Sequence, residues 1–236
     1  MWAVIVLLFL ADKAFADGIK DVDCEQRAFR VCNPEMRRID FPGSEDDLNA
    51  ACPIFISRAE CLNNYDEVCA TKEEDSREFK PGQFKKVLDL LKDVCNNNSL
   101  LHKVLSENMG CIKESVENAG DVCTPQRSVL RKTYIAQRDI DYESESFDEM
   151  MKFQCLLTYN MLSCVTGEIS RRCGDVTKSA VQEITFRSDI LQSERCPPEH
   201  TSDMVDLVND LELPAEQKQQ ILGYISSFNA WAAERE

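Results

Sequence analysis

Histidine and glycine are scarce in this chain of 236 residues, which has two histidines and eight glycines. The glycines are scattered singly, so there is no G-x-G-x-x-G, G-x-x-x-x-G-K or G-x-S-x-G motif, and H-E-x-x-H is also absent. We interpret His102, beside helix-facing leucines, and His200, after a proline pair, as structural or solvated. We therefore predict no catalytic residue, no cofactor and a protein that is not an enzyme.

Basic residues are also in deficit. The chain has 27 Lys and Arg against 42 Asp and Glu, which gives a net charge of −15 and a pI near 4.6. A nucleic-acid partner is excluded, because binding phosphates requires a basic face. No apolar run reaches the roughly 20 residues that cross a bilayer, so no membrane span is expected. Hydrophobic residues make up 43% of the chain, which is enough for a buried core.

The first sixteen residues resemble a secretory signal peptide. The apolar block 2–11 is followed by Ala14-Phe15-Ala16, which has the small-x-small form that signal peptidase cleaves. The block is about half the length of a membrane span, which argues against an anchor. We predict cleavage between Ala16 and Asp17, and a secreted, extracellular protein.

Cysteine is the abundant exception. All twelve cysteines lie after the predicted cleavage site, and their number is even, which predicts disulfides formed in an oxidising compartment. Zinc is disfavoured because the chain has no C-x-x-C pair and only two histidines, so no metal site is expected. Free reactive thiols are disfavoured as well, because an acidic surface raises thiol pKa values.

The cysteine spacing repeats along the chain. Residues 52–69 read C-x8-C-x7-C and residues 155–173 read C-x8-C-x8-C, each with two cysteines before and one after. This order predicts an internal duplication into two six-cysteine repeats. The predicted organisation is a signal peptide (1–16), a first repeat (17–105), a second repeat (106–196) and an acidic C-terminal tail (197–236).

The hydrophobic period indicates helices. In residues 84–95 the apolar side chains recur at i, i+3, i+4 and i+7, and residues 147–173 show a similar pattern. Ser44 and Asp47 form a capping-box-like helix start, whereas Gly110 and Gly120 are interpreted as interruptions. No segment alternates with period two. The predicted fold is all-α, a disulfide-stapled helical protein with two repeats and a C-terminal pair of amphipathic helices.

The tail carries that helix pair. One helix places Met204, Leu207, Val208 and Leu211 on one face, and the next begins near Pro214. The tail holds eight acids and two bases, net −6, which disfavours a lipid surface. The two helices either pack on the disulfide-stapled body or bind a protein partner.

Disulfide connectivity follows from a ladder argument, although a six-cysteine repeat allows many connectivities. Cys24 and Cys32 are eight residues apart, as are Cys61 and Cys69, so the pairs can face each other on two antiparallel helices. The unequal spacing in the second repeat requires a skew or a break near Gly120. The predicted bridges are Cys24–Cys69, Cys32–Cys61, Cys52–Cys95, Cys111–Cys173, Cys123–Cys164 and Cys155–Cys196.

One modification signal is present. Asn97-Asn98-Ser99 is an N-glycosylation acceptor directly after Cys95, at the end of a predicted helix. In a chain that enters the secretory pathway, Asn97 is predicted to be glycosylated, unless a neighbouring disulfide hides it first.

The runs ECLNNYDEVC, FKKVLDLLKDVC, MGCIKESVENAGDVC and QCLLTYNMLSCVTGEISRRC, closed by Cys196, resemble the arthropod 27 kDa hemolymph glycoprotein family. The similarity covers roughly residues 24 to 196 and is carried by cysteine order and hydrophobic spacing. It implies a helical, cysteine-rich extracellular protein of hemolymph or of a secretion. It brings no catalytic motif.

Three functions remain in view. The first is a non-enzymatic secreted protein that binds an extracellular protein or a small apolar ligand between its helices. The second is a structural or bulk component of a secretion such as venom, silk or hemolymph, in which the charge serves solubility. The third and least favoured is a hydrolase with an unrecognised site, because carboxylates are abundant but no catalytic pair is visible in the sequence.

Overall fold

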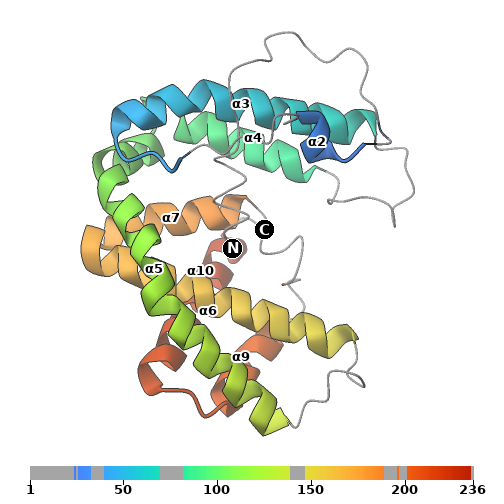
Figure 1. Cartoon of the computed structure of the whole chain (residues 1–236), viewed down its shortest axis with the longest axis vertical. Coiled ribbons are helices and arrows are strands. Elements are labelled where there is room, and N and C mark those ends of the chain that lie inside the picture. Colours follow the sequence, from blue (N-terminus) through green and yellow to red (C-terminus); the bar gives the residue numbers. More distant parts are fainter. Residues whose placement is uncertain are drawn as a thin grey trace. The chain divides into compact units, whose positions relative to one another are not determined.

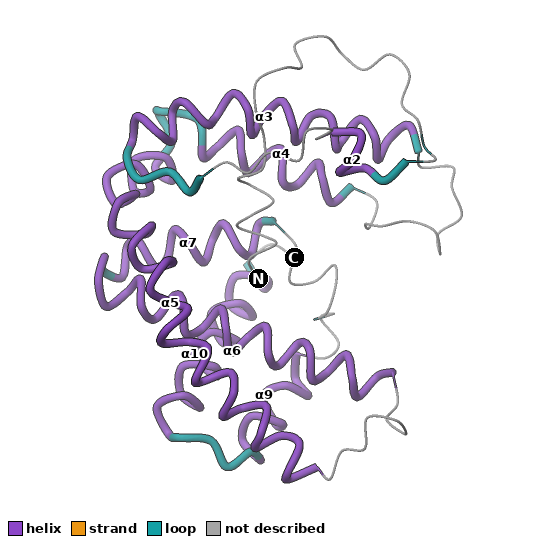
Figure 2. Tube along the Cα trace, in the orientation of Figure 1, coloured by secondary structure: helices purple, strands orange, loops and turns teal. Residues whose placement is uncertain are grey.

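The protein is all-α over the part of the chain that its computed structural model describes (Figure 2). That part comprises Cys24, residues 26–32, 40–69, 82–138 and 147–188, Cys196 and residues 201–234. The predicted signal peptide, its cleavage site and His200 lie outside it. The helices in Figure 1 are α2 (Ala28–Cys32), α3 (Glu45–Val68), α4 (Gln83–Val94), α5 (Leu100–Arg138), α6 (Phe147–Cys173), α7 (Asp175–Arg187), α9 (Thr201–Asp210) and α10 (Ala215–Ala233).

The chain forms two compact units. The N-terminal unit extends to Lys113 and also takes in Glu183–Ile190, and the C-terminal unit contains Glu114–Gln182 and Leu191–Glu236. The boundary predicted at residues 105/106 falls inside helix α5, as does the division at Lys113. The helices of the acidic tail belong to the C-terminal unit.

Helix α3 begins where the sequence predicts. The Ser44 hydroxyl accepts a hydrogen bond from the backbone N–H of Asp47 at 3.1 Å, which satisfies one of the free donors of the first turn. The Asp47 carboxylate in turn accepts from the N–H of Gly43 at 3.0 Å. This backbone hydrogen bond is the main reason why the pKa of Asp47 is lowered, with the Ser44 hydroxyl and the charge of Lys113 contributing less.

The N-terminal core lies between α3 and α4. Phe55 and Ala59 of α3 pack against Leu88 and Leu91 of α4, and next to them Leu62 packs with Phe84 and the residues of α2. These residues recur at helical spacing on both helices, so the amphipathic pattern of residues 84–95 is confirmed, with α4 spanning Gln83–Val94. Figure 1 shows α2, α3 and α4 lying together.

Helix α5 is uninterrupted, and the predicted break near Gly120 is wrong. The helix passes through Gly110, Gly120 and Pro125 over 39 residues. Glycine costs about 1 kcal/mol in a helix interior, which the burial of the helix's apolar residues outweighs. Gly110 also has a packing role, because a Cβ atom there would lie 3.2 Å from the carbonyl oxygen of Gly43.

The C-terminal core is organised around α6, whose predicted ends at Phe147 and Cys173 are confirmed. Helix α10 packs on both α6 and α9. The predicted inner face of α9 is buried, and so are Ile221, Ile225 and Phe228 of α10. Met150, an apolar residue in the first turn of α6, is 46% exposed. The tail helices therefore pack within the disulfide-stapled C-terminal unit.

Candidate functional site

The described disulfides follow the predicted ladder. The N-terminal unit contains Cys24–Cys69, Cys32–Cys61 and Cys52–Cys95, with Cα–Cα distances of 5.6–5.7 Å. The rungs are less regular than predicted, because Cys24 lies in a turn before α2 and not on a helix. Two helices are therefore not needed for the pairing. The order of the cysteines along α3 and the segment opposite it is sufficient.

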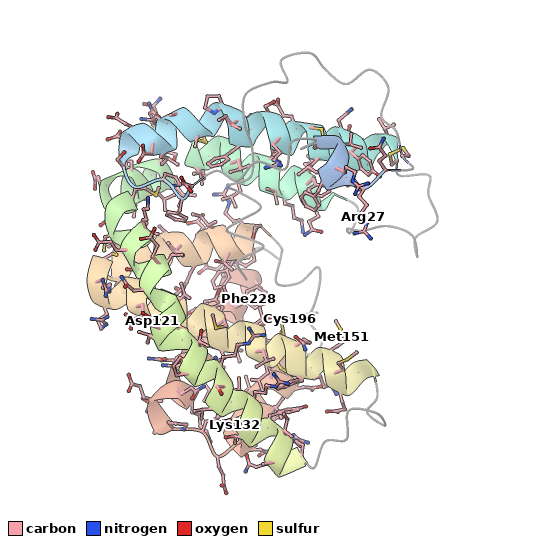
Figure 3. All side chains as sticks on the ribbon, viewed as in Figure 1. Arg27, Asp121, Lys132, Met151, Cys196 and Phe228 are labelled. Carbon is pink, nitrogen blue, oxygen red and sulfur yellow. A yellow bond between two sulfur atoms is a disulfide. The ribbon has the colours of Figure 1, made fainter. Side chains whose placement is uncertain are left out.

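The C-terminal unit contains Cys123–Cys164, which joins α5 to α6, and Cys155–Cys196, which attaches Cys196 (labelled in Figure 3) to α6. Cys111 and Cys173 are disulfide-bonded as well, and no cysteine is free. Cys123–Cys164 and Cys155–Cys196 both have a sequence separation of 41 residues, so each should reduce the entropy of the unfolded chain by a similar amount.

The predicted glycosylation site is accessible. Asn97 is exposed in the turn between α4 and α5. Ser99 of the same sequon caps α5, since its hydroxyl accepts from the N–H of His102 at 2.9 Å and donates to the carbonyl oxygen of Asp93 at 2.8 Å. The folded turn therefore presents the Asn97 side chain to solvent while it uses the Ser99 hydroxyl internally.

His102 has a structural environment. The residue is 2% exposed, and its Nδ1 lies 2.8 Å from the carbonyl oxygen of Val94, which assigns the proton to Nδ1. This contact ties the first turn of α5 to the end of α4. The other ring nitrogen, Nε2, is buried without a hydrogen-bond partner, so neither ring nitrogen is hydrogen-bonded to a described nucleophile or carboxylate.

Arg58 is the unusual buried charge, and sequence reasoning missed it. It lies on α3 between Phe55 and Leu62, on the helix face that carries the N-terminal core. The residue is 6% exposed, yet none of its three guanidinium nitrogens has a hydrogen-bond partner. Its position in the sequence could have indicated this burial. Arg58 follows Phe55 by three residues and precedes Leu62 by four, so it lies on the same helix face as these two apolar residues.

Burial lowers the pKa of the Arg58 guanidinium to about 10, and no charged neighbour contributes to the shift. The side chain is therefore still a cation at neutral pH. Enclosing a cation without a counter-charge is costly, because the lost hydration is not replaced by any protein group.

Two other partly buried cations, Lys152 and Arg187, are paired with carboxylates. Lys152 on α6 lies 2.9 Å from Asp148 and 3.5 Å from Asp203 of α9, and the hydrogen bond with Asp148 is the largest cause of the raised pKa of Lys152. Arg187 forms ion pairs with Asp93 and Glu183. Arg58 therefore differs from both, although it is more deeply buried than either.

The C-terminal unit buries neutral polar groups, and these bond to one another. The Gln217 amide of α10 donates to Asn160 Oδ1 of α6 at 2.7 Å and to the carbonyl oxygen of Gln126 of α5 at 2.9 Å. Both amide side chains are buried. One side chain thus links three helices, although the Asn160 Nδ2 group is left without a hydrogen-bond partner.

Tyr159 lies beside this polar contact in an aromatic cluster. Its ring is fully buried and lies 6.2 Å from Tyr224 and 6.4 Å from Phe228 of α10, which is labelled in Figure 3. Burial raises the pKa of the Tyr159 hydroxyl to about 12, and an interaction with Thr201 opposes the shift only in part. The hydroxyl is therefore neutral at physiological pH.

Among the described residues, no group of three or more His, Cys, Asp or Glu side chains is placed to hold a metal ion. None of the described helices is long and apolar enough to cross a membrane. The fold and the buried groups thus define an all-α, disulfide-rich protein in which, among the described residues, Arg58 is a buried charge without a hydrogen-bond partner. Comparison with models of known families, with curated proteins and with solved structures finds no match to the chain.

Proposed function

We propose that this is a secreted, non-enzymatic extracellular protein that acts by binding, either a small apolar ligand or an extracellular protein partner. The observation that carries the proposal is Arg58, a charged group enclosed on an apolar helix face with no hydrogen-bond partner among the residues that the structure describes. A bulk component of a secretion has no need for such a group. An unpaired donor set in an apolar setting is what a ligand-binding site provides before its ligand arrives.

The extracellular setting has its own support. Disulfides persist in oxidising compartments, and all twelve cysteines of this chain are paired. The exposure of Asn97 supports its glycosylation. The resemblance to the arthropod 27 kDa hemolymph glycoprotein family adds hemolymph or a related secretion as the proposed fluid. Cleavage between Ala16 and Asp17 completes the proposal.

The test is to express the chain with its signal peptide in insect cells and to purify the protein from the medium. Native mass spectrometry should show a bound small molecule, which organic extraction releases and identifies. The same protein, extracted and re-measured, is the control. If the secreted protein carries no small molecule and neither binds nor co-purifies with any protein of the source fluid, the bulk-component function replaces the one proposed here.

A further inference from the structure

The position of Arg58 is fixed by covalent bonds on both sides. Cys52 and Cys61 precede and follow Arg58 on α3, and each forms a disulfide within the N-terminal unit, with Cys95 and Cys32. Packing of Phe55 and Ala59 against Leu88 and Leu91 holds the same stretch of helix against α4. The position and orientation of the helix backbone that carries Arg58 are therefore fixed within the unit.

None of the acidic residues of α3 is hydrogen-bonded to Arg58. The carboxylate of Asp66 accepts from the N–H of Gly82 at 2.8 Å, and that of Glu67 accepts from Asn63 at 2.8 Å. Glu60 lies on the exposed face of the helix. In a chain with a net charge of −15, it is a property of this site and not of the composition that no carboxylate of the described residues is hydrogen-bonded to the buried arginine.

The chemistry of the missing partner follows from the guanidinium group. It presents five N–H donors in a planar fork that matches a carboxylate or another oxyanion, and such charge-assisted hydrogen bonds are about twice as strong as neutral ones. A neutral acceptor would satisfy the donors but leave the charge uncompensated. An anion does both.

The surroundings of Arg58 indicate what the anion is attached to. Its neighbours along the helix face are Phe55, Ala59 and Leu62, which belong to the apolar clusters between α2, α3 and α4. The strong net negative charge of the protein disfavours the approach of small hydrophilic anions. An apolar chain on the ligand overcomes this barrier, because its transfer from water to an apolar setting is favourable.

We propose that Arg58 binds the anionic head group of a small amphiphilic ligand, whose apolar part lies against the side chains of α3 and α4. This inference rests on the proposed binding function and names the class of ligand, an amphiphile with an oxyanion head such as a medium- or long-chain carboxylate. Arg58 is then the residue that selects an acid over the corresponding alcohol.

The experiment measures binding by isothermal titration calorimetry to the mature, extracted protein. The probes are laurate, the neutral dodecanol with the same chain, and inorganic phosphate as an anion without a chain. Laurate is expected to bind about 10- to 100-fold more tightly than dodecanol, which is the range that a charge-assisted hydrogen bond of 1.5–3 kcal/mol supplies. Phosphate alone is expected not to bind.

The variants separate Arg58 from the general charge of the unit. Arg58→Met is expected to abolish the preference for laurate while dodecanol still binds, and Arg58→Lys to retain part of it. Lys85→Met removes an exposed cation from the neighbouring helix α4 and is expected to leave the preference intact. Circular dichroism of each variant verifies the fold, and the conservative Arg58→Lys provides the answer if Arg58→Met does not fold.

The outcomes distinguish a failure of the role assigned to Arg58 from a failure of the proposed binding function. Equal affinity of the wild-type protein for laurate and dodecanol, or a preference that survives in Arg58→Met, overturns the role of Arg58 but leaves the binding function standing. Phosphate binding as tight as that of laurate overturns the amphiphile and leaves a simple anion site. If neither chain-bearing probe binds, the inference and the small-ligand form of the proposed function both fail.

Discussion

Gln217 of the C-terminal unit and Arg58 of the N-terminal unit are two buried polar side chains in opposite situations. In the C-terminal unit, Gln217, Asn160 and the backbone of Gln126 satisfy one another across three helices. In the described part of the N-terminal unit, Arg58 is enclosed without a hydrogen-bond partner. Satisfied buried polar groups specify how helices pack, whereas an unsatisfied charge reduces stability and is retained for another purpose. The comparison thus separates a structural contact from a candidate binding residue.

The largest effect on stability should come from loss of the disulfides, which both units contain. Complete reduction of the disulfides is expected to unfold the chain and remove most of the helical signal in far-UV circular dichroism, because each bridge contributes about 2–4 kcal/mol and stability totals only about 5–15 kcal/mol. Alkylation without reductant should add no mass, since every cysteine is paired. An unchanged spectrum and melting temperature after reduction would contradict the central role of the bridges.

A matched pair of bridges then compares the units directly. Cys52–Cys95 and Cys123–Cys164 have sequence separations of 43 and 41 residues, so the entropic model predicts nearly equal contributions of about 4 kcal/mol. Replacing both cysteines of either bridge by alanine should lower the free energy of unfolding by similar amounts in urea titrations. A difference above about 2 kcal/mol would show that the two units do not depend equally on their bridges.

Removal of the buried amide contact should destabilise the C-terminal unit. Gln217→Leu leaves Asn160 Oδ1 and the Gln126 carbonyl oxygen without their donor, at an expected cost of about 2–3 kcal/mol. The double variant Asn160→Leu/Gln217→Leu should cost less than the sum of the single variants, because no buried amide is then left unpaired. Urea denaturation of the four proteins measures this coupling, and additive losses would mean that the two amides do not act together.

The effect of Arg58→Met on the free energy of unfolding should have the opposite sign. In the ligand-free protein it removes an unpaired cation from an apolar setting and keeps an unbranched side chain of similar length. We expect the free energy of unfolding to rise by about 1–2 kcal/mol. Lys85→Met, at an exposed position, should change it by less than about 0.5 kcal/mol. A marked loss of stability in Arg58→Met would show that the arginine has a structural partner and would end the contrast between the units.

The smallest effect concerns alkaline pH. The folded-state pKa of Tyr159 is raised to about 12, above the ordinary value near 10, so its neutral form contributes stability that is fully present below pH 10. That contribution is lost as the pH rises from 10 through 12, by about 1 kcal/mol at pH 11. Arg58, whose pKa is lowered to about 10, acts in the opposite direction over the same range.

The measurement compares wild-type protein with Tyr159→Phe. Arg58 is present in both proteins, so its pH-dependent contribution to stability cancels in the comparison. The difference in unfolding free energy between the two proteins should change between pH 9 and pH 11, and the ultraviolet absorbance of tyrosinate should show one group that ionises near pH 12 only in the wild type. A constant difference across this range would mean that the Tyr159 hydroxyl is accessible to water.

Several local patterns were sufficient to predict structure. The apolar period of residues 147–173 located α6 at both ends, and the Ser44 side chain caps α3 as its sequence context indicates. Pro214 immediately precedes α10. These predictions succeed because capping and amphipathic periods involve residues within one or two helical turns, and such interactions are visible in a stretch of sequence.

Helix α5 shows where local reading fails. Gly110 and Gly120 have the lowest helix propensity after proline, and they were read as interruptions. In the fold, residues such as Ile112, Val116 and Ala119 between and beside them are buried, and the cost of the glycines is small compared with that burial. Gly110 is moreover required where the backbone of Gly43 approaches the helix. Both effects depend on segments that are distant in the sequence.

The sequence by itself determined the all-α class. The order and spacing of its cysteines left many connectivities open, among which the ladder argument selected the bridges that the fold contains: Cys24–Cys69, Cys32–Cys61, Cys52–Cys95, Cys123–Cys164 and Cys155–Cys196. Only the tertiary structure decided which buried polar groups are satisfied. Asn160 and Arg58 both occupy inward positions on their helices. Asn160 meets Gln217, 57 residues further along the chain, whereas no described residue forms a hydrogen bond with Arg58. The hydrophobic period that turns a side chain inward is local, but its hydrogen-bond partner comes from another helix, and only packing brings the two together.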